Sequence, residues 1–292
     1  MPAKTAKLCS KTKLPHLRDV IAQYNLEARR SLGQHFLLDL NLTRRIVKSA
    51  GDLNNQSVIE IGPGPGGLTR ALLETSAKEV IAVERDERCI KGLKTLVNAF
   101  PERLKIIEAD ALKLNLINIA DKDKIKVVAN LPYNVSIPLL IGWLRQLSAI
   151  KSMTLMFQKE VADRISAKPG TRGYGRTSVI AQWLCEVETV FFIPARAFVP
   201  SPKVVSAVVN FTPRLQPLAP ASFKILETVT AAAFGQRRKM LRSALKTLHP
   251  HPIDLLTHAN INPEARAETL TVEEFCKIAE SYRELVLPRI SQ

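Results

Sequence analysis

The segment "IEIGPGPGGLT", residues 59–69, is the most informative part of the sequence about the fold. An apolar run ends in a loop that holds four glycines and two prolines, and a segment with helical spacing follows. Glycine adopts positive φ readily and lets a ligand approach the backbone closely, as in the loop after the first strand of nucleotide-binding α/β sheets. The stretch therefore predicts a strand, a ligand-binding loop and a helix, although glycines at this spacing also satisfy the dinucleotide fingerprint.

The flanking sequence extends this unit. Between residues 57 and 165, short apolar runs alternate with longer amphipathic segments, which is typical of βαβ units and a parallel sheet. The runs at 187–194 and 206–213 have no clear helix between them, so we expect an antiparallel pair that ends the sheet. Beyond three prolines the pattern is helical, most clearly at 234–248 and 271–285. The expected parts are a basic N-terminal extension, an α/β domain and a small helical domain, at residues 1–20, 21–214 and 215–292.

The composition indicates which class of partner and which cellular compartment to expect. Lys and Arg outnumber Asp and Glu by 42 to 27, a formal charge of +15. This excess suits nucleic acid before an anionic membrane, with a merely solvated surface as the alternative. The four cysteines lie far apart without metal-ligand spacing, so we expect no metal site and a reducing compartment. No long apolar run is free of interruption, and the basic N-terminus lacks the apolar core of a secretory signal. The expected location is the cytoplasm, and an organellar presequence stays open.

Two acids end later strands of the alternating pattern. Glu84 lies 22 positions after Gly62, where its carboxylate could accept hydrogen bonds from both ribose hydroxyls of an adenosine ligand. Asp110 ends the following strand, where a carboxylate can accept the adenine amine. Pro63 and Pro65 stiffen the loop, and a ligand without a phosphate at this place needs a shaped backbone wall more than free amides. The combination favours S-adenosylmethionine over NAD, and surface acids that cap strands are the structural alternative.

The segment "NLPY", residues 130–133, stops the next strand, because proline has no amide hydrogen for a sheet. That strand should lie beside the first, so Asn130 would face the same pocket. The Asn130 side-chain carbonyl and the Leu131 backbone carbonyl could each accept an N–H bond from an adenine or cytosine amine. The nitrogen would then approach tetrahedral geometry, with its lone pair aimed at a methyl sulfonium. Tyr133 would offer a ring on which the extruded base stacks, unless the strand merely ends in a turn with Tyr133 in the core.

Taken in order, these and later motifs resemble the S-adenosylmethionine-dependent adenine-N6 dimethyltransferases of ribosomal RNA, specifically the small-subunit type. The resemblance runs from about residue 15 to 288 and is carried by "SLGQHFLLD", "EIGPGPGGLT", "NLPYNVSIPLL", "QKEVADRI", "FVPSPKVVSAVV" and "FGQRRKMLRSAL". It implies a Rossmann-like class I methyltransferase domain with a small C-terminal helical domain. The implied activity is methyl transfer from S-adenosylmethionine to the N6 atoms of two adjacent adenosines near the 3′ end of small-subunit (16S) ribosomal RNA.

The resemblance also assigns residues. It implies that the cofactor is held by His35, Leu37, Gly62, Glu84, Asp110 and Asn130, the first two at its methionine end, and that the target base meets Asn130, Leu131, Tyr133 and Phe198. His35 is a departure, because asparagine is commoner there, and a lone histidine in an apolar stretch otherwise indicates a structural role. Phe198 resembles the ring on the opposite side of the target base, with a core phenylalanine as the alternative.

Several cations are candidates for RNA phosphate contact: Lys203, Arg237, Arg238, Lys239 and Arg242. Four of them fall within six positions of one expected helix. On a strongly basic chain this clustering favours RNA contact over a solvated helix face.

Three other functions stay open. A large-subunit ribosomal RNA dimethyltransferase of the antibiotic-resistance type shares the catalytic motif, although "LRDVIAQ" and "RAETLTVEEF" resemble the small-subunit type more. An NAD-dependent oxidoreductase would explain the glycine loop but leave residues 130–133 unused. A non-catalytic RNA-binding assembly factor would need the basic segment but no cofactor pocket. The expected partner is ribosomal RNA within a pre-small-subunit particle, and the expected state is a monomer.

Overall fold

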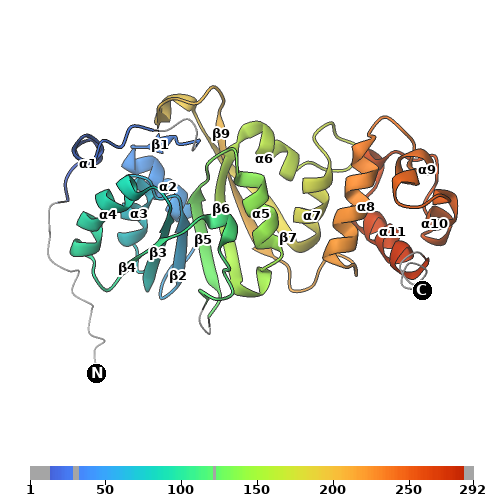
Figure 1. Ribbon diagram of the computed structural model, residues 1–292, viewed down its shortest axis with the longest axis horizontal. Helices are drawn as coiled ribbons and strands as arrows, with labels where there is room; N and C mark the ends of the chain where they lie inside the picture. Colours follow the sequence, from blue (N-terminus) through green and yellow to red (C-terminus); the bar gives the residue numbers. More distant parts are fainter. Residues whose placement is uncertain (1–13, 29–32, 121–122, 286–292) are drawn as a thin grey trace.

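The computed structural model describes residues 14–28, 33–120 and 123–285 (Figure 1). The strands are β1 (Phe36–Leu37), β2 (Ser57–Ile61), β3 (Glu79–Glu84), β4 (Leu104–Glu108), β5 (Ile125–Asn130), β6 (Ile150–Gln158), β7 (Cys185–Ile193), β8 (Phe198–Val199) and β9 (Ser206–Pro213). The helices are α1 (Leu17–Gln23), α2 (Leu40–Ser49), α3 (Gly67–Leu73), α4 (Glu87–Ala99), α5 (Ser136–Leu144), α6 (Lys159–Ile165), α7 (Arg176–Leu184), α8 (Phe223–Gly235), α9 (Leu241–Ala244), α10 (Pro252–His258) and α11 (Val272–Leu285).

The main sheet has the strand order β4-β3-β2-β5-β6-β9-β7. The pairs from β4 to β6 are parallel, and β9 pairs antiparallel with both β6 and β7. The predicted parallel sheet with an antiparallel end is therefore confirmed. The chain leaves β2 towards β3 and β4 and returns on the other side of β2 at β5. Open α/β sheets bind ligands at such a reversal, outside the carboxyl ends of the strands.

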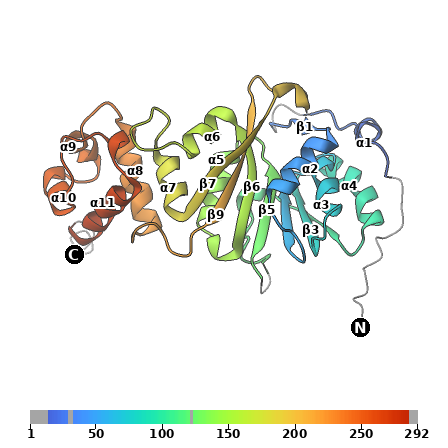
Figure 2. The ribbon, with the colours of Figure 1, turned by 180° about the vertical axis from the view of Figure 1, so that it is seen from behind.

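Both faces of the sheet are covered, as near-continuous apolar strands require. Neighbouring strand residues point to opposite faces. Val58 and Val128 belong to the apolar cluster formed with α2, α3 and α4, whereas Ile59 and Val127 belong to the cluster formed with α5, α7 and the C-terminal helices. Figures 1 and 2 show those C-terminal helices at the end of the molecule opposite α1. The second cluster thus runs from the sheet into the C-terminal region.

The expected helix over 234–248 is wrong in its middle. Helix α8 ends at Gly235, residues 236–239 form a turn, and α9 begins at Leu241. The turn is fixed from outside the segment, because Leu241 donates its amide hydrogen to Ala265 and Arg242 donates to Pro263. Tertiary hydrogen bonding has overridden helix propensity here.

Other elements bear on the expected organisation of the chain. The sequence pattern missed α7 and the short antiparallel pair of β1 with β8. Strand β9 ends and α8 begins on either side of the expected boundary at 214/215. Residues 1–13 of the expected N-terminal extension lie outside the described residues. No helix in the described part of the chain is long and apolar enough to cross a membrane.

Candidate active site

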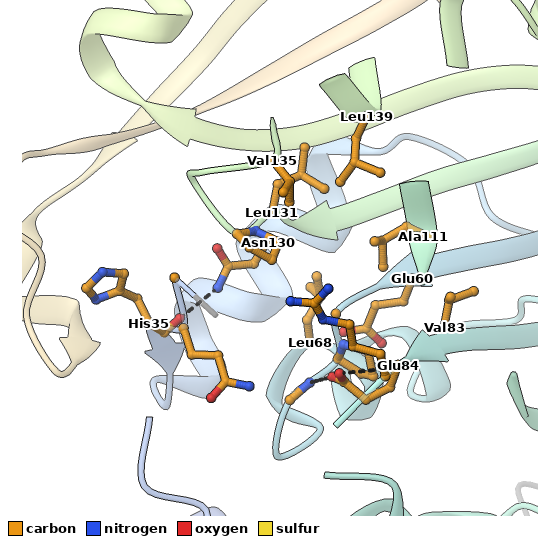
Figure 3. Close-up of a pocket in the computed structure, with 18 of the residues that line it drawn as sticks. His35, Glu60, Leu68, Val83, Glu84, Ala111, Asn130, Leu131, Val135 and Leu139 are labelled. Carbon is orange, nitrogen blue, oxygen red and sulfur yellow. Dashed lines mark hydrogen bonds between the residues drawn. The ribbon is translucent and has the colours of Figure 1, made fainter. Parts of the chain in front are cut away.

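A pocket lies at the carboxyl ends of β2, β3 and β5, where the strand order reverses (Figure 3). The glycine loop, residues 33–37 and the turn after β5 line it, including the predicted Leu37, Gly62 and Leu131. Gly62 has φ of +66°, a conformation that other residues rarely adopt. A Cβ at Gly67 would lie 2.6 Å from the Leu37 carbonyl oxygen. Glycine is therefore required both to turn the loop and to let α3 approach β1.

Glu84 ends β3 inside this pocket and is held by the loop that it faces. Its carboxylate accepts amide hydrogens from Gly64 at 3.2 Å, Arg85 at 2.8 Å and Asp86 at 2.9 Å. Burial raises the pKa of Glu84, and the three amides partly offset the rise. A carboxylate has about four acceptor positions, so capacity remains for a ligand hydroxyl.

Asp110 lies at the rim of the same pocket, after β4. Its carboxylate accepts the Leu112 amide hydrogen at 3.0 Å and lies 3.5 Å from the Arg85 guanidinium. Both side chains of this ion pair are partly exposed, so the pair itself contributes little stability. The structure thus places the two predicted acids in one pocket, Glu84 at the end of β3 and Asp110 just beyond the adjacent β4.

Glu60 is a pocket residue that the sequence interpretation missed. Its side chain, on β2, is 1% exposed, and its Oε2 atom has no hydrogen-bond partner among the described residues. Burial raises the pKa of Glu60 to about 8, although the nearby Thr69 favours the charged form. Leaving a buried carboxylate without a donor is costly, so Glu60 is poised for a donor supplied by a ligand. An acid inside an apolar strand, two residues before Gly62, was the available signal.

Asn130 ends β5 with its amide in a defined orientation (Figure 3). Nδ2 donates to the backbone carbonyl of His35 at 3.1 Å. Because a carbonyl can only accept, this bond assigns the nitrogen and leaves Oδ1 free to accept a hydrogen from a ligand. The His35 ring points away from the pocket in Figure 3, and its Nδ1 lies 2.8 Å from the Pro200 carbonyl. His35 therefore reaches Asn130 through its backbone, which any residue at this position would provide.

The two predicted base-stacking rings are placed differently. Tyr133 lines the pocket, its hydroxyl lies 2.6 Å from the Ser206 hydroxyl, and its ring stacks on His35 with centroids 5.4 Å apart. Phe198 is 2% exposed, belongs to the cluster with α2, α3 and α4, and is not among the pocket-lining residues. Of these two rings, only that of Tyr133 lies at the pocket.

The predicted RNA-contact cations do not form one cluster. Lys203 lies in the segment before β9, near the sheet. The other four follow α8, among the C-terminal helices at the far end of the molecule (Figure 1). Arg237 donates to the Arg172 carbonyl at 3.0 Å and lies 3.7 Å from Glu268. Arg242 lies 3.5 Å from Glu264. Lys203, Arg238 and Lys239 are exposed, with no ion pair to any described residue.

The chain is similar to known proteins along almost its whole length. Residues 25–284 match the family model described as ribosomal RNA adenine dimethylase. A ribosomal RNA small subunit methyltransferase A from Rhodospirillum rubrum is 58% identical over 266 residues, which cover 91% of this chain and 92% of that protein. A protein of the same name from Rhizobium etli is 52% identical, covering 92% of this chain and 98% of its own length.

The chain also resembles solved structures of RNA-modifying methyltransferases. A dimethyladenosine transferase from Plasmodium falciparum is 27% identical, with a TM-score of 0.73 over 86% of this chain and 98% of that chain. The 23S rRNA methyltransferase ErmE is 25% identical, with a TM-score of 0.64 over 85% of this chain and 100% of that chain.

Proposed function

Because the chain belongs to the ribosomal RNA adenine dimethylase family, we propose that it transfers methyl groups to the N6 atoms of two adjacent adenosines near the 3′ end of small-subunit ribosomal RNA. The fold is that of a class I methyltransferase with a helical C-terminal region. The chain is a ribosomal RNA adenine methyltransferase, and relatives at 50–58% identity carry the small-subunit name. The large-subunit alternative has weaker support, since ErmE is only 25% identical.

The pocket fits S-adenosylmethionine, which supplies an electrophilic methyl sulfonium when bound. Glu84 has acceptor capacity for the ribose hydroxyls, and Asp110 at the rim for the adenine amine. The unpartnered Oε2 of Glu60 suits the ammonium of the methionine portion. Gly62, Leu37 and the backbone near His35 form the wall along this portion. The ionised carboxylates of Glu84 and Asp110 would repel a diphosphate, which argues against a dinucleotide.

The observation that carries the chemistry is the orientation of Asn130. With Nδ2 held by the His35 carbonyl, Oδ1 accepts one hydrogen of the adenine amine, and the Leu131 carbonyl accepts the other. These bonds strengthen as the nitrogen becomes tetrahedral, so they stabilise the transition state more than the bound substrate. The target base stacks on Tyr133 after it leaves its helix, and Phe198 joins it only if the segment around β8 opens.

The proposed partner is ribosomal RNA within a pre-small-subunit particle, bound by a monomer in the cytoplasm. Lys203, Arg238 and Lys239 are the proposed phosphate contacts, because their charges are not satisfied by described residues. Arg237 and Arg242 already have acidic neighbours, so their proposed role in RNA binding is the weaker one. A non-catalytic assembly factor would need these cations but not the oriented Asn130.

Incubation with labelled S-adenosylmethionine and small subunits that lack the modification tests the proposal. Mass mapping of the RNA should locate two methyl groups on each of two adjacent adenosines near the 3′ end. Methylation of large-subunit RNA instead would support the resistance-type activity, and an absence of transfer to either subunit would overturn the proposal.

A further inference from the structure

A second hollow lies beside the pair of β1 and β8. It is lined by the start of α1, the segment after β1, Arg70 of α3 and the stretch from Arg196 to Val199. The groove encloses about 670 Å³, ample for a sugar-phosphate unit. Figures 1 and 2 both show α1 and β1 beside the segment that joins β7 to β9. Neither the cofactor nor the target amine, as placed above, uses this groove.

Arg70 is the unusual residue of this groove. Its side chain is 8% exposed, its Nη1 donates to the Pro15 carbonyl at 2.6 Å, and its Nε is buried without a partner. Burial lowers the pKa of Arg70, and no described carboxylate pairs with it. Residues 1–13, which precede the groove in the chain, contain no Asp or Glu. A buried cation without an ion-pair partner is costly, so Arg70 is suited to an anion bound in the groove.

Two further arginines add positive charge at the surface of the groove. Arg18 and Arg196 are exposed and have no ion pair to any described residue. Two acids also line it. Asp39 uses its carboxylate to accept amide hydrogens from Asn41 and Leu42, and Asp19 is exposed. Three guanidinium groups thus line the groove with two carboxylates, one of which accepts hydrogen bonds from the N-terminus of α2.

The groove is connected to the reaction site through the pair of β1 and β8. Phe36 of β1 lines the cofactor pocket and pairs with Val199 of β8, which lines the groove. Residue 35, immediately before β1, holds Asn130 through its carbonyl. The pocket that would receive an extruded base and the groove therefore share this two-stranded ribbon.

We propose that the groove of Arg18, Arg70 and Arg196 binds a phosphodiester of the RNA strand next to the target adenosine. This inference rests on the proposed function, because it takes RNA as the substrate. Guanidinium groups suit a phosphate, since their planar N–H donors match its oxygens in pairs. The contact holds the strand in register while the base is out of its stack.

The test is the double variant Arg18→Gln/Arg196→Gln, which changes two exposed side chains and leaves the buried Arg70 in place. Binding to unmodified small subunits is measured across a range of salt concentrations. A plot of log affinity against log salt concentration has a negative slope. Each lost phosphate contact should make this slope less steep, by about 0.9 for a duplex or about 0.7 for a single strand. The affinity for S-adenosylmethionine and the melting temperature should stay close to the parent values.

The matched control is Lys78→Gln/Lys124→Gln, which removes the same charge from exposed positions just before β3 and β5, at the edge of the sheet opposite the pocket. An equal change of slope in both variants would contradict the proposal that the groove binds a phosphodiester. If inorganic phosphate at constant ionic strength stabilises the parent but not the groove variant, while the RNA slope is unchanged, the groove takes a free anion and the proposal also fails. Methyl transfer by the parent protein is measured in parallel. If transfer is normal but the groove variant behaves like the control, only the proposal about the groove is wrong. If the parent protein transfers no methyl group, the proposed function is wrong.

Discussion

At the residue scale, the reaction depends on which atom of Asn130 faces the pocket. Asn130→Ala removes the acceptor for the adenine amine and should lower turnover by about 10²–10³-fold, the loss typical when one oriented polar group at the reacting atoms is removed. Cofactor affinity should change only a few-fold. Turnover and calorimetric binding measured on the purified variant check both expectations.

The control for Asn130 is His35→Asn. The His35 ring is bonded to Pro200 rather than to the pocket, so this variant should retain most of its turnover because the backbone carbonyl that holds Asn130 is unchanged. Near-normal turnover in Asn130→Ala, or a comparable loss in His35→Asn, would contradict the assignment.

Glu60 predicts a pH dependence of stability whose sign follows from its raised pKa. The folded chain keeps this carboxyl protonated up to about pH 8, whereas the unfolded chain releases the proton near 4.5. Between these values the folded state holds one more proton, so its stability falls as pH rises, by about 1.4 kcal/mol per pH unit. The contribution is complete below about pH 4.5 and lost above about 8. Glu60→Gln should remove this part of the slope in denaturant titrations, and an unchanged slope would argue against a protonated Glu60.

The same residue predicts proton release on cofactor binding. If the ammonium of S-adenosylmethionine meets Glu60, the carboxyl becomes charged, and near pH 7 close to one proton should leave per bound cofactor. Calorimetry in buffers of different ionisation enthalpy measures this number directly. Glu60→Gln should bind without release. A binding enthalpy independent of buffer in the parent protein would place the ammonium elsewhere.

The sequence predicted which polar residues end the strands but not how they are held. Glu84, Asp110 and Asn130 were recognisable because each follows an apolar run, and parallel strands bring such ends to one edge. The contact of His35 with Pro200 and that of Tyr133 with Ser206 join residues 165 and 73 positions apart. No local pattern encodes such pairs. The burial of Phe198 likewise depends on the pairing of β8 with β1.

At the element scale, the four cations that follow α8 are of two kinds, those with an ion pair to a described residue and those without. Arg238→Gln/Lys239→Gln changes side chains without ion pairs to described residues, so it should lower the salt slope of small-subunit binding by up to about 0.9 per lost contact, with little change in melting temperature. Arg237→Gln/Arg242→Gln, the matched pair, removes contacts to Glu268, Glu264 and the Arg172 carbonyl. It should lower the melting temperature more than the salt slope. The reverse pattern would mean that Arg237 and Arg242 contact the RNA, whereas Arg238 and Lys239 stabilise the fold.

At the scale of the whole molecule, the expected boundary at 214/215 does not separate two hydrophobic cores. One buried cluster contains Val127 and Leu155 of the sheet together with Leu226 of α8 and Phe275 of α11. Polar contacts cross the same junction, since the Trp183 indole donates to the Ala219 carbonyl at 2.8 Å. Proline spacing revealed where the chain changes character, but only the packing shows that the two parts share an interior.

A shared interior predicts that the full chain unfolds in one cooperative step. The calorimetric and van't Hoff enthalpies should agree, because removing the C-terminal helices exposes the apolar face of α7. Glu227 of α8 offers a direct probe, since it lies 2.5 Å from Arg145, just after α5, and 2.8 Å from Arg176, the first residue of α7. Its side chain is 19% exposed but both arginines are about half exposed, so Glu227→Gln should cost only about 1 kcal/mol and lower the melting temperature by about 2–4 °C. The exposed pair of Lys159 and Asp163 is the control, and Asp163→Asn should change the melting temperature less. Two separate transitions in the parent protein, or a Glu227 variant in which only one of two transitions moves, would show that the helical region folds as an independent domain.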